Sequence, residues 1–190
     1  MHFFVKGLNL KDNVGYIEKA RALFDSYDSN VWIKEGFPEL HISGFDNQTG
    51  GFVVYHREHN FDPTKGKFKI ERGHYEKYAS EVLSKYGMRV ELFSEKKDEN
   101  NPLNKKPDGF LNGKIFDIKG IEGSGNENVL KDMKDASKKG AEAIVLYYHD
   151  ENLFSENQIR ESYRTYLRNS QSKRIQHVYY IVNGKLYYLK

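Results

Sequence analysis

The chain has 190 residues, of which 38% are hydrophobic and 30% charged, so we expect a soluble globular protein with a core of its own. It has no cysteine, which excludes disulfides, thiolate metal sites and cysteine nucleophiles. The 30 basic and 27 acidic residues give a formal net charge of +3, too balanced to indicate nucleic-acid binding by itself. No apolar run approaches the ~18 residues of a membrane helix, and the first residues lack a signal-peptide pattern. We therefore expect no membrane partner and a cytoplasmic location.

Hydrophobic periodicity and turn residues divide the chain into alternating helices and strands. Apolar side chains at helical spacing mark the helices, as Tyr75, Ala79 and Val82 do for one of them. Residues 30–51 are rich in Gly, Pro and Asn and predict a loop with short extended pieces. In chain order, the predicted elements are a helix at 13–27, a strand at 51–56, a helix at 74–87, a strand at 88–93, a hairpin within 106–120, a helix at 126–140, a strand at 141–148, a helix at 155–170 and a hairpin at 176–190.

This alternation predicts an α/β (α+β) fold in which helices flank a mixed β-sheet. Residues 1–60 are less regular than the rest of the chain. We expect them to form an N-terminal helical or irregular extension, or a subdomain, beside an α/β domain at 61–190.

The stretch KPDGFLNGKIFDIKG, residues 106–120, places charged side chains among apolar ones. Its Asn112-Gly113 pair is a strong signal for a two-residue type I′ turn, which fixes the register of the two strands. In that register Asp108 lies directly opposite Asp117, about 4.5–5.5 Å away at Cβ. Lys119 follows two residues later on the same face. Opposed like charges destabilise a hairpin unless a cation intervenes or one acid keeps its proton.

Two adjacent carboxylates offer the hard oxygen ligands that Mg²⁺ or Mn²⁺ prefers. A bound ion lowers the pKa of a water molecule and stabilises charge on a phosphate, and a neighbouring lysine holds the attacking water or the phosphate by its charge. The sequence therefore predicts a divalent metal site at Asp108 and Asp117 with Lys119 beside it. The alternative is that both aspartates end short surface strands and are fully solvated, with Asp108 only starting a turn.

Pro107-Asp108 followed by Asp117-Ile118-Lys119 resembles the PD-(D/E)xK motif of nucleases with the restriction-endonuclease-like fold. In the order of its elements, the part from 74 to 190 is also similar to the C-terminal tRNA nuclease domains of contact-dependent growth inhibition toxins, and to related domains of phages and conjugative elements. The similar segments are YEKYASEVLSKYGMRVELF, KPDGFLNGKIFDIKG, NVLKDMKDASKKGAEAIVLYY and HVYYIVNGKLYYL.

This resemblance implies a restriction-endonuclease-like core and a metal-dependent nuclease of a toxin or mobile element. The implied substrate is RNA, tRNA in particular, with DNA as the second choice. The resemblance also implies delivery into a target-cell cytoplasm and a cognate immunity or inhibitor protein.

Nucleases of this kind usually add an acid from the preceding helix, where Glu71, Glu76 and Glu81 are the candidates. Glu76 lies at the edge of the apolar stripe, in line with Ala79 and Leu83, whereas Glu81 points to the opposite side. We therefore expect Glu76 to complete the catalytic and metal-binding set. The alternative is an ordinary solvent-facing glutamate.

Four further residues are candidates for nucleic-acid contact: His56, His59, Lys138 and Lys139. The histidines lack an obvious set of further zinc ligands. Either could act as an acid–base group or simply be a polar residue at a strand end. The lysines could contact a phosphate backbone or offset the dipole of their helix. Two other classes of function stay open: a non-catalytic nucleic-acid-binding or assembly module of a phage or conjugative element, and a metal-independent ribonuclease that uses His56 or His59.

Overall fold

The computed structural model describes residues 14–40, 44–96, 106–169 and 174–189. Residues 1–13 of the predicted extension and 41–43 of the predicted loop lie outside them, as do 97–105, 170–173 and 190. The helices are α1 (Val14–Ser26), α2 (Arg72–Lys85), α3 (Asn126–Lys138) and α4 (Glu156–Asn169), with short 3₁₀ turns at Pro38–Leu40 and Glu151–Leu153. The strands are β1 (Trp32–Ile33), β2 (Phe52–His56), β3 (Arg89–Leu92), β4 (Gly109–Leu111), β5 (Lys114–Ile121), β6 (Ala143–Tyr148), β7 (His177–Val182) and β8 (Lys185–Leu189).

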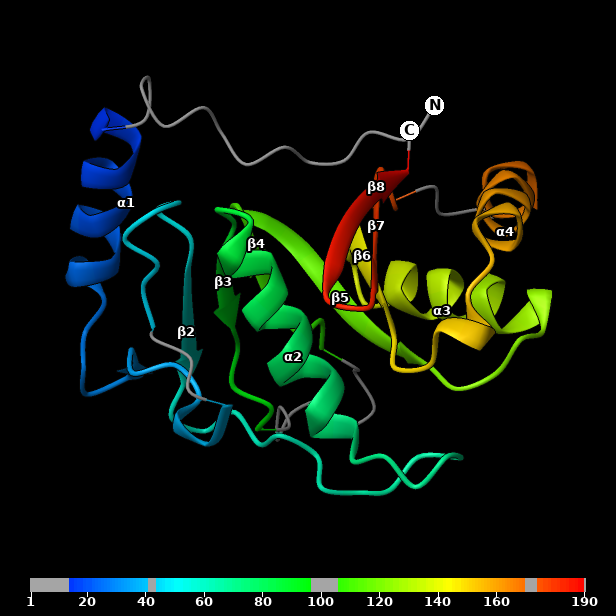
Figure 1. The fold of residues 1–190 in the computed structure, drawn as a ribbon, viewed down its shortest axis with the longest axis horizontal. Coiled ribbons are helices and arrows are strands. Elements are labelled where there is room, and N and C mark those ends of the chain that lie inside the picture. Colours follow the sequence, from blue (N-terminus) through cyan, green and yellow to red (C-terminus); the bar gives the residue numbers. More distant parts are fainter. Residues whose placement is uncertain (1–13, 41–43, 97–105, 170–173, 190) are drawn as a thin grey trace.

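The strands named above form a single mixed sheet in the order β1 to β8, so neighbours in the chain are neighbours in the sheet. The parallel pairs are β2 with β3, β5 with β6 and β6 with β7. Parallel neighbours need a crossover connection, and α2, α3 and α4 provide these three in turn (Figure 1). The other neighbouring strands are antiparallel. The prediction of a mixed sheet flanked by helices is confirmed.

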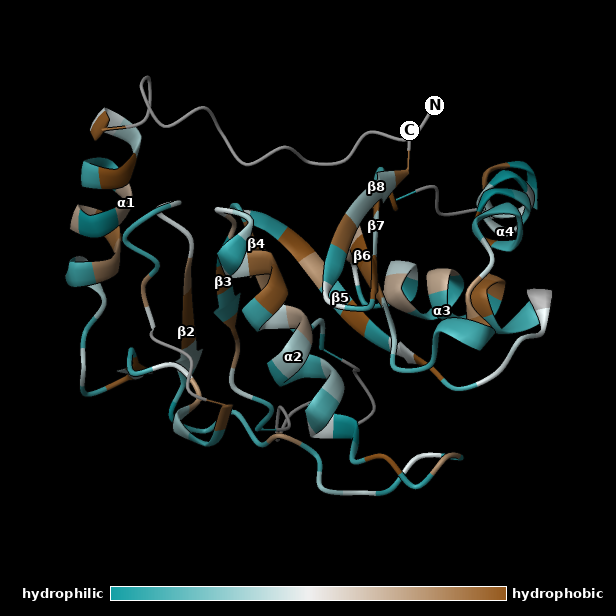
Figure 2. Ribbon diagram, in the orientation of Figure 1, coloured by the Kyte–Doolittle hydropathy of each residue, from teal (hydrophilic) through white to brown (hydrophobic). Residues whose placement is uncertain are grey.

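The helices cover both faces of the sheet. Helix α2 packs on one face, where its Ala79 and Leu83 join a core with side chains from β2 to β8. Helices α3 and α4 cover the opposite face over β5 to β8, and α1 packs there over β2. Figure 2 shows hydrophobic residues along β2 and hydrophilic ones over much of α4. None of the helices in the described part of the chain has the length and hydrophobicity needed to cross a membrane.

Both predicted hairpins form, and each turns at an Asn-Gly pair, Asn112-Gly113 in the first and Asn183-Gly184 in the second. Asn112 and Gly113 have φ values of 51° and 79°, as a type I′ turn requires, and Gly109 pairs with Phe116 as the predicted register demands. The loop with short extended pieces predicted over 30–51 contains the two-residue strand β1, which pairs with β2 at the edge of the sheet. The described part of the first 60 residues therefore shares its sheet with the rest of the chain.

One close contact fixes the position of α2 over β5. The ring of Tyr75, near the start of α2, lies so close to Gly120 that a Cβ atom there would be 2.0 Å from the ring carbon Cδ2. Only glycine fits such an approach. As a result the N-terminal part of α2, which carries Glu76, lies beside the C-terminal part of β5, which carries Lys119.

Candidate active site

The hairpin of β4 and β5 brings Asp108 and Asp117 together. Asp108 immediately precedes β4, and its backbone N–H donates to the Phe116 carbonyl at 3.1 Å. Its carboxylate oxygen Oδ2 accepts a hydrogen bond from the Ile118 N–H at 2.5 Å, which holds the side chain against β5. Asp117 lies in the middle of β5 with a fully buried side chain. The two carboxylates are therefore neighbours in a poorly solvated place. The alternative in which both aspartates are fully solvated at the ends of surface strands is wrong.

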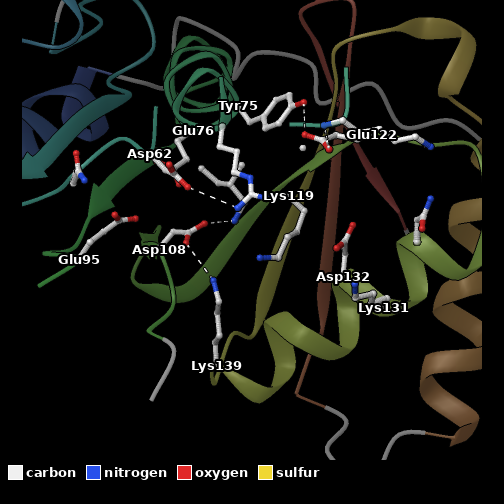
Figure 3. Close-up of a pocket in the computed structure, with 17 residues that line it drawn as sticks. Asp62, Tyr75, Glu76, Glu95, Asp108, Lys119, Glu122, Lys131, Asp132 and Lys139 are labelled. Carbon is white, nitrogen blue, oxygen red and sulfur yellow. Dashed lines mark hydrogen bonds and ion pairs between the residues drawn. The ribbon is translucent and has the colours of Figure 1, made fainter. Parts of the chain in front are cut away.

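Two lysines face these carboxylates from different elements. Lys119 of β5 places its Nζ 2.6 Å from Asp117 Oδ2. Lys139, at the end of α3, places its Nζ 2.7 Å from Asp117 Oδ1 and 3.6 Å from Asp108 Oδ1. Figure 3 shows Lys139 reaching from its helix toward Asp108. Asp117 Oδ2 is buried, and among the described residues its polar contact is the ion pair with Lys119.

The two aspartates differ in their pKa values. Burial raises the pKa of Asp108 well above the usual range, and the negative charge of Asp117 adds to this shift. Burial also opposes ionisation of Asp117, but the charges of Lys119 and Lys139 outweigh it and lower the pKa of that carboxyl. For Lys119 the charges of Asp117 and Asp108 outweigh burial and raise its pKa. Asp117 is therefore held as a carboxylate, whereas Asp108 binds a proton readily when no further cation is near.

Glu76 enters the site from α2 together with a histidine. The His59 ring is fully buried; its Nδ1 lies 2.6 Å from the Phe93 carbonyl and its Nε2 lies 3.2 Å from Glu76 Oε2. Burial opposes protonation of His59, but the hydrogen bond and charge of Glu76 outweigh it and raise its pKa. Glu95, just beyond β3, completes a group in which ligand atoms of His59, Glu76 and Glu95 lie within 4.8 Å of one another. Such a group can hold a metal ion.

One pocket of about 640 Å³ is lined by Asp108, Lys119, Lys139, Glu76 and Glu95 among others. Its wall is strongly polar, so it suits a charged ligand rather than an apolar one. Figure 3 shows its labelled side chains, which come from α2, β5, α3 and the loops beside them. The charged residues of the lining are Asp62, Lys67, Arg72, Glu76, Glu95, Asp108, Lys119, Glu122, Lys131, Asp132 and Lys139.

The structure brings some of the predicted site residues together and leaves others apart. Asp108, Lys119, Glu76 and Lys139 line the pocket, and Asp117 lies directly behind the two lysines. His59 reaches the pocket only through Glu76. Lys138 is exposed, pairs with Asp135 at 3.4 Å and does not line the pocket. His56 does not line it either; its ring packs against Trp32 at the edge of the sheet.

Sequence reasoning missed Asp132 and Glu95. Asp132 lies on α3 beside Lys119, and burial raises its pKa to about 6, with Lys119 opposing the shift. A sequence signal existed for this residue, because Asp132 and Lys139 are seven residues apart and therefore share one face of a helix. No sequence signal existed for Glu95, because it follows β3 in a segment without hydrophobic periodicity.

Comparison with known protein families gives one match. Searches of curated proteins and of solved structures returned none. The matching segment, residues 105–186, spans less than half of the chain; it includes Asp108, Asp117, Lys119 and Lys139 but not Glu76. The family is described as the contact-dependent growth inhibition CdiA C-terminal domain, and this part of the chain is therefore similar to the C-terminal domain of a growth inhibition toxin.

Proposed function

We propose that this chain is a metal-dependent nuclease that hydrolyses phosphodiester bonds. The observation that carries the proposal is the joint position of Asp108, Asp117 and Lys119. The hairpin register and the 2.6 Å ion pair support the assignment of these three residues to the PD-(D/E)xK pattern, and Asp108 and Lys119 line the polar pocket. The similarity of residues 105–186 to a growth inhibition toxin domain supports a destructive enzymatic activity.

The donor set fits Mg²⁺ or Mn²⁺. Asp108, Asp117 and Glu76 offer carboxylate oxygens, the ligands that these hard ions prefer. Burial raises the pKa of Asp108 and the charge of Asp117 adds to the shift, so a further cation nearby would favour the ionised form of Asp108. Asp117 is fully buried and is held as a carboxylate by Lys119 and Lys139. A divalent cation beside it would offset the burial of Asp108. We assign Asp108, Asp117 and Glu76 as the residues that would hold it.

The protein's own groups have distinct tasks in this account. When bound, the metal ion would supply an acidified water and charge stabilisation at the phosphate. Lys119, anchored by Asp117, positions the attacking water and stabilises the charge that develops on the phosphate. His59 holds Glu76 in the orientation that faces the pocket. Lys139 balances Asp117 and approaches the substrate from the end of α3.

RNA, and tRNA in particular, is our first proposal for the substrate, with DNA second. The similarity to contact-dependent growth inhibition toxins is the support for both choices, and for a cognate immunity protein and action inside a target cell. The structure supports a metal-independent mechanism through His59 less well than the metal-dependent one, because the His59 ring is fully buried and both of its nitrogens have partners. His56 is no better placed, because it does not line the pocket.

A non-catalytic nucleic-acid-binding or assembly module is the second candidate. One observation favours it: Lys119 and Lys139 already neutralise Asp117, as they would in a purely structural ion-pair network. In that case the pocket would bind a nucleic acid without cutting it.

The test is cleavage of total tRNA and of plasmid DNA by the purified chain with Mg²⁺, with Mn²⁺ and with EDTA. Asp117→Asn serves as the site variant and Asp135→Asn, a half-buried aspartate on α3 that does not line the pocket, as its control. The proposal expects metal-dependent cutting that Asp117→Asn loses and Asp135→Asn keeps. Cutting that survives both EDTA and Asp117→Asn would exclude the metal mechanism. Folded protein that cuts neither polymer would favour the binding module.

A further inference from the structure

A basic turn formed by residues 65–69, Lys-Gly-Lys-Phe-Lys, projects beside the candidate site. It precedes α2, and Figure 1 shows this segment as a narrow loop at the lower edge of the molecule. The Gly66 N–H donates to the Ile70 carbonyl at 2.8 Å and the Lys69 N–H to the Gly66 carbonyl at 2.9 Å. A bridge between Lys65 and Glu71 closes its base. The turn is therefore an ordered hairpin rather than an open loop.

Glu122 ties the basic turn to the strand that carries the site. Its Oε2 accepts the Lys67 backbone N–H at 2.8 Å, and its Oε1 accepts the Tyr75 hydroxyl at 3.1 Å. Glu122 follows β5 directly, three residues after Lys119. The position of the basic turn is thus fixed relative to the proposed reacting centre, and the Lys67 side chain lines the same pocket as Asp108 and Lys119.

The charges of the basic turn are only partly balanced. Lys65 pairs with Glu71 at 2.6 Å. Within the part of the chain that the structure describes, Lys67 and Lys69 form no ion pair with an acidic side chain. Both are exposed. Two cations are therefore available to a ligand with negative charges.

Phe68, between these two lysines, is 42% exposed. It is the only exposed aromatic side chain in the ranges that the structure describes. Its ring contacts His149, with centroids 5.3 Å apart, and Lys67 Nζ lies 5.5 Å from its centroid. These neighbours hold the ring in place while much of it stays open to solvent. Exposing an aromatic ring costs free energy, and a ring flanked by cations suits a nucleobase joined to phosphates.

We propose that the basic turn binds an unpaired nucleotide of the substrate. Phe68 stacks on the base, while Lys67 and Lys69 contact the adjacent phosphates. This inference rests on the proposed nuclease function and narrows its substrate to single-stranded segments, such as the loops and ends of folded RNA. In a duplex the faces of the bases are covered by their neighbours, so the ring would have nothing to stack on.

The experiment measures the affinity of the full chain for a labelled RNA oligonucleotide by fluorescence anisotropy in EDTA. The same sequence is tested as a single strand and within a perfect duplex. The variants are Phe68→Ala and Phe68→Trp, with Leu167→Ala, another exposed hydrophobic residue at 37%, as the control on α4. Because EDTA prevents metal-dependent cutting, the affinity is read independently of catalysis.

We expect Phe68→Ala to weaken single-strand binding by about 5- to 150-fold, the range for loss of one stacked base. Phe68→Trp and Leu167→Ala should bind like the original chain, and duplex affinity should not respond to Phe68. Unchanged single-strand affinity in Phe68→Ala, an equal loss for the duplex, or no binding of RNA by the original chain would each overturn the inference. Failure of the nuclease proposal would appear separately, as absence of metal-dependent cleavage.

Discussion

Replacement of Asp132 by asparagine should stabilise the fold at neutral pH. Burial raises the pKa of this carboxyl from 3.8 to about 6, with Asp135 contributing to the rise and Lys119 opposing it. A carboxyl with a raised folded-state pKa stabilises the protein most below its unfolded-state pKa, and this contribution is lost as the pH rises through the folded-state value. Above pH 6 the buried charge is therefore a cost, and asparagine, which is neutral and similar in shape, removes it.

The size of the effect follows from the two pKa values. Their difference corresponds to roughly 3 kcal/mol near pH 7.5, and to less than about 1 kcal/mol near pH 4, where the carboxyl is protonated in the folded state. The larger figure is an upper limit, because asparagine also removes a charge that stabilises Lys119.

Urea unfolding in EDTA at the two pH values measures the stabilisation at each pH, with Asp25→Asn on α1 as the control. Asp25 is exposed, so its replacement should change the free energy of unfolding by less than about 0.5 kcal/mol. Equal stabilisation by Asp132→Asn at both pH values, or destabilisation at neutral pH, would refute the reasoning.

Three further predictions concern residues around the site. Lys139→Met should lower the free energy of unfolding in EDTA by about 1–3 kcal/mol, because buried Asp117 then keeps only Lys119 as a partner. Lys138→Met is the control and should change the free energy of unfolding by less than about 0.5 kcal/mol. Urea titration measures both values. Gly120→Ala should lower the free energy of unfolding by about 1–3 kcal/mol, because the new Cβ atom would meet the Tyr75 ring. Gly15→Ala is the control. A Cβ atom there would have no tertiary neighbour within 4 Å, so the free energy of unfolding should change by no more than about 1 kcal/mol. His59→Gln should destabilise the fold more at about pH 5.5 than at about pH 9. The folded-state pKa of His59 is raised, so the stability that the histidine contributes is lost as the pH rises. Thermal unfolding measures this at both pH values, and an equal loss at the two would contradict the importance of the pair between His59 and Glu76.

The central part of the site could be predicted because its information is local. The Asn112-Gly113 turn sets a register, and a register determines which side chains share a face. That reasoning placed Asp108 beside Asp117, and in the structure Lys139 Nζ lies 3.6 Å from the first carboxylate and 2.7 Å from the second. Glu76 followed from helical periodicity, and the structure places it in the same pocket.

The other contacts of the site depend on how segments that are distant in the sequence pack together, and no local sequence pattern encodes this packing. The contact between Lys139 and Asp117 joins residues that are 22 apart in the chain, and it requires α3 to lie across β5. The partnership of His59 with Glu76 requires a loop after β2 to fold against α2. Strand β1 has two residues, too few to produce an alternating pattern, and it forms because β2 offers an open edge.

The most direct test of the account is whether the aspartates of the hairpin bind a divalent cation. Isothermal titration of Mn²⁺ into the original chain, Asp117→Asn and Asp135→Asn would measure this, with circular dichroism to show that each protein is folded. We expect saturable binding of Mn²⁺ by the unsubstituted protein and by Asp135→Asn, and at least about a tenfold weaker affinity in Asp117→Asn. Equal affinity in all three proteins, or no binding by the folded original chain, would contradict it.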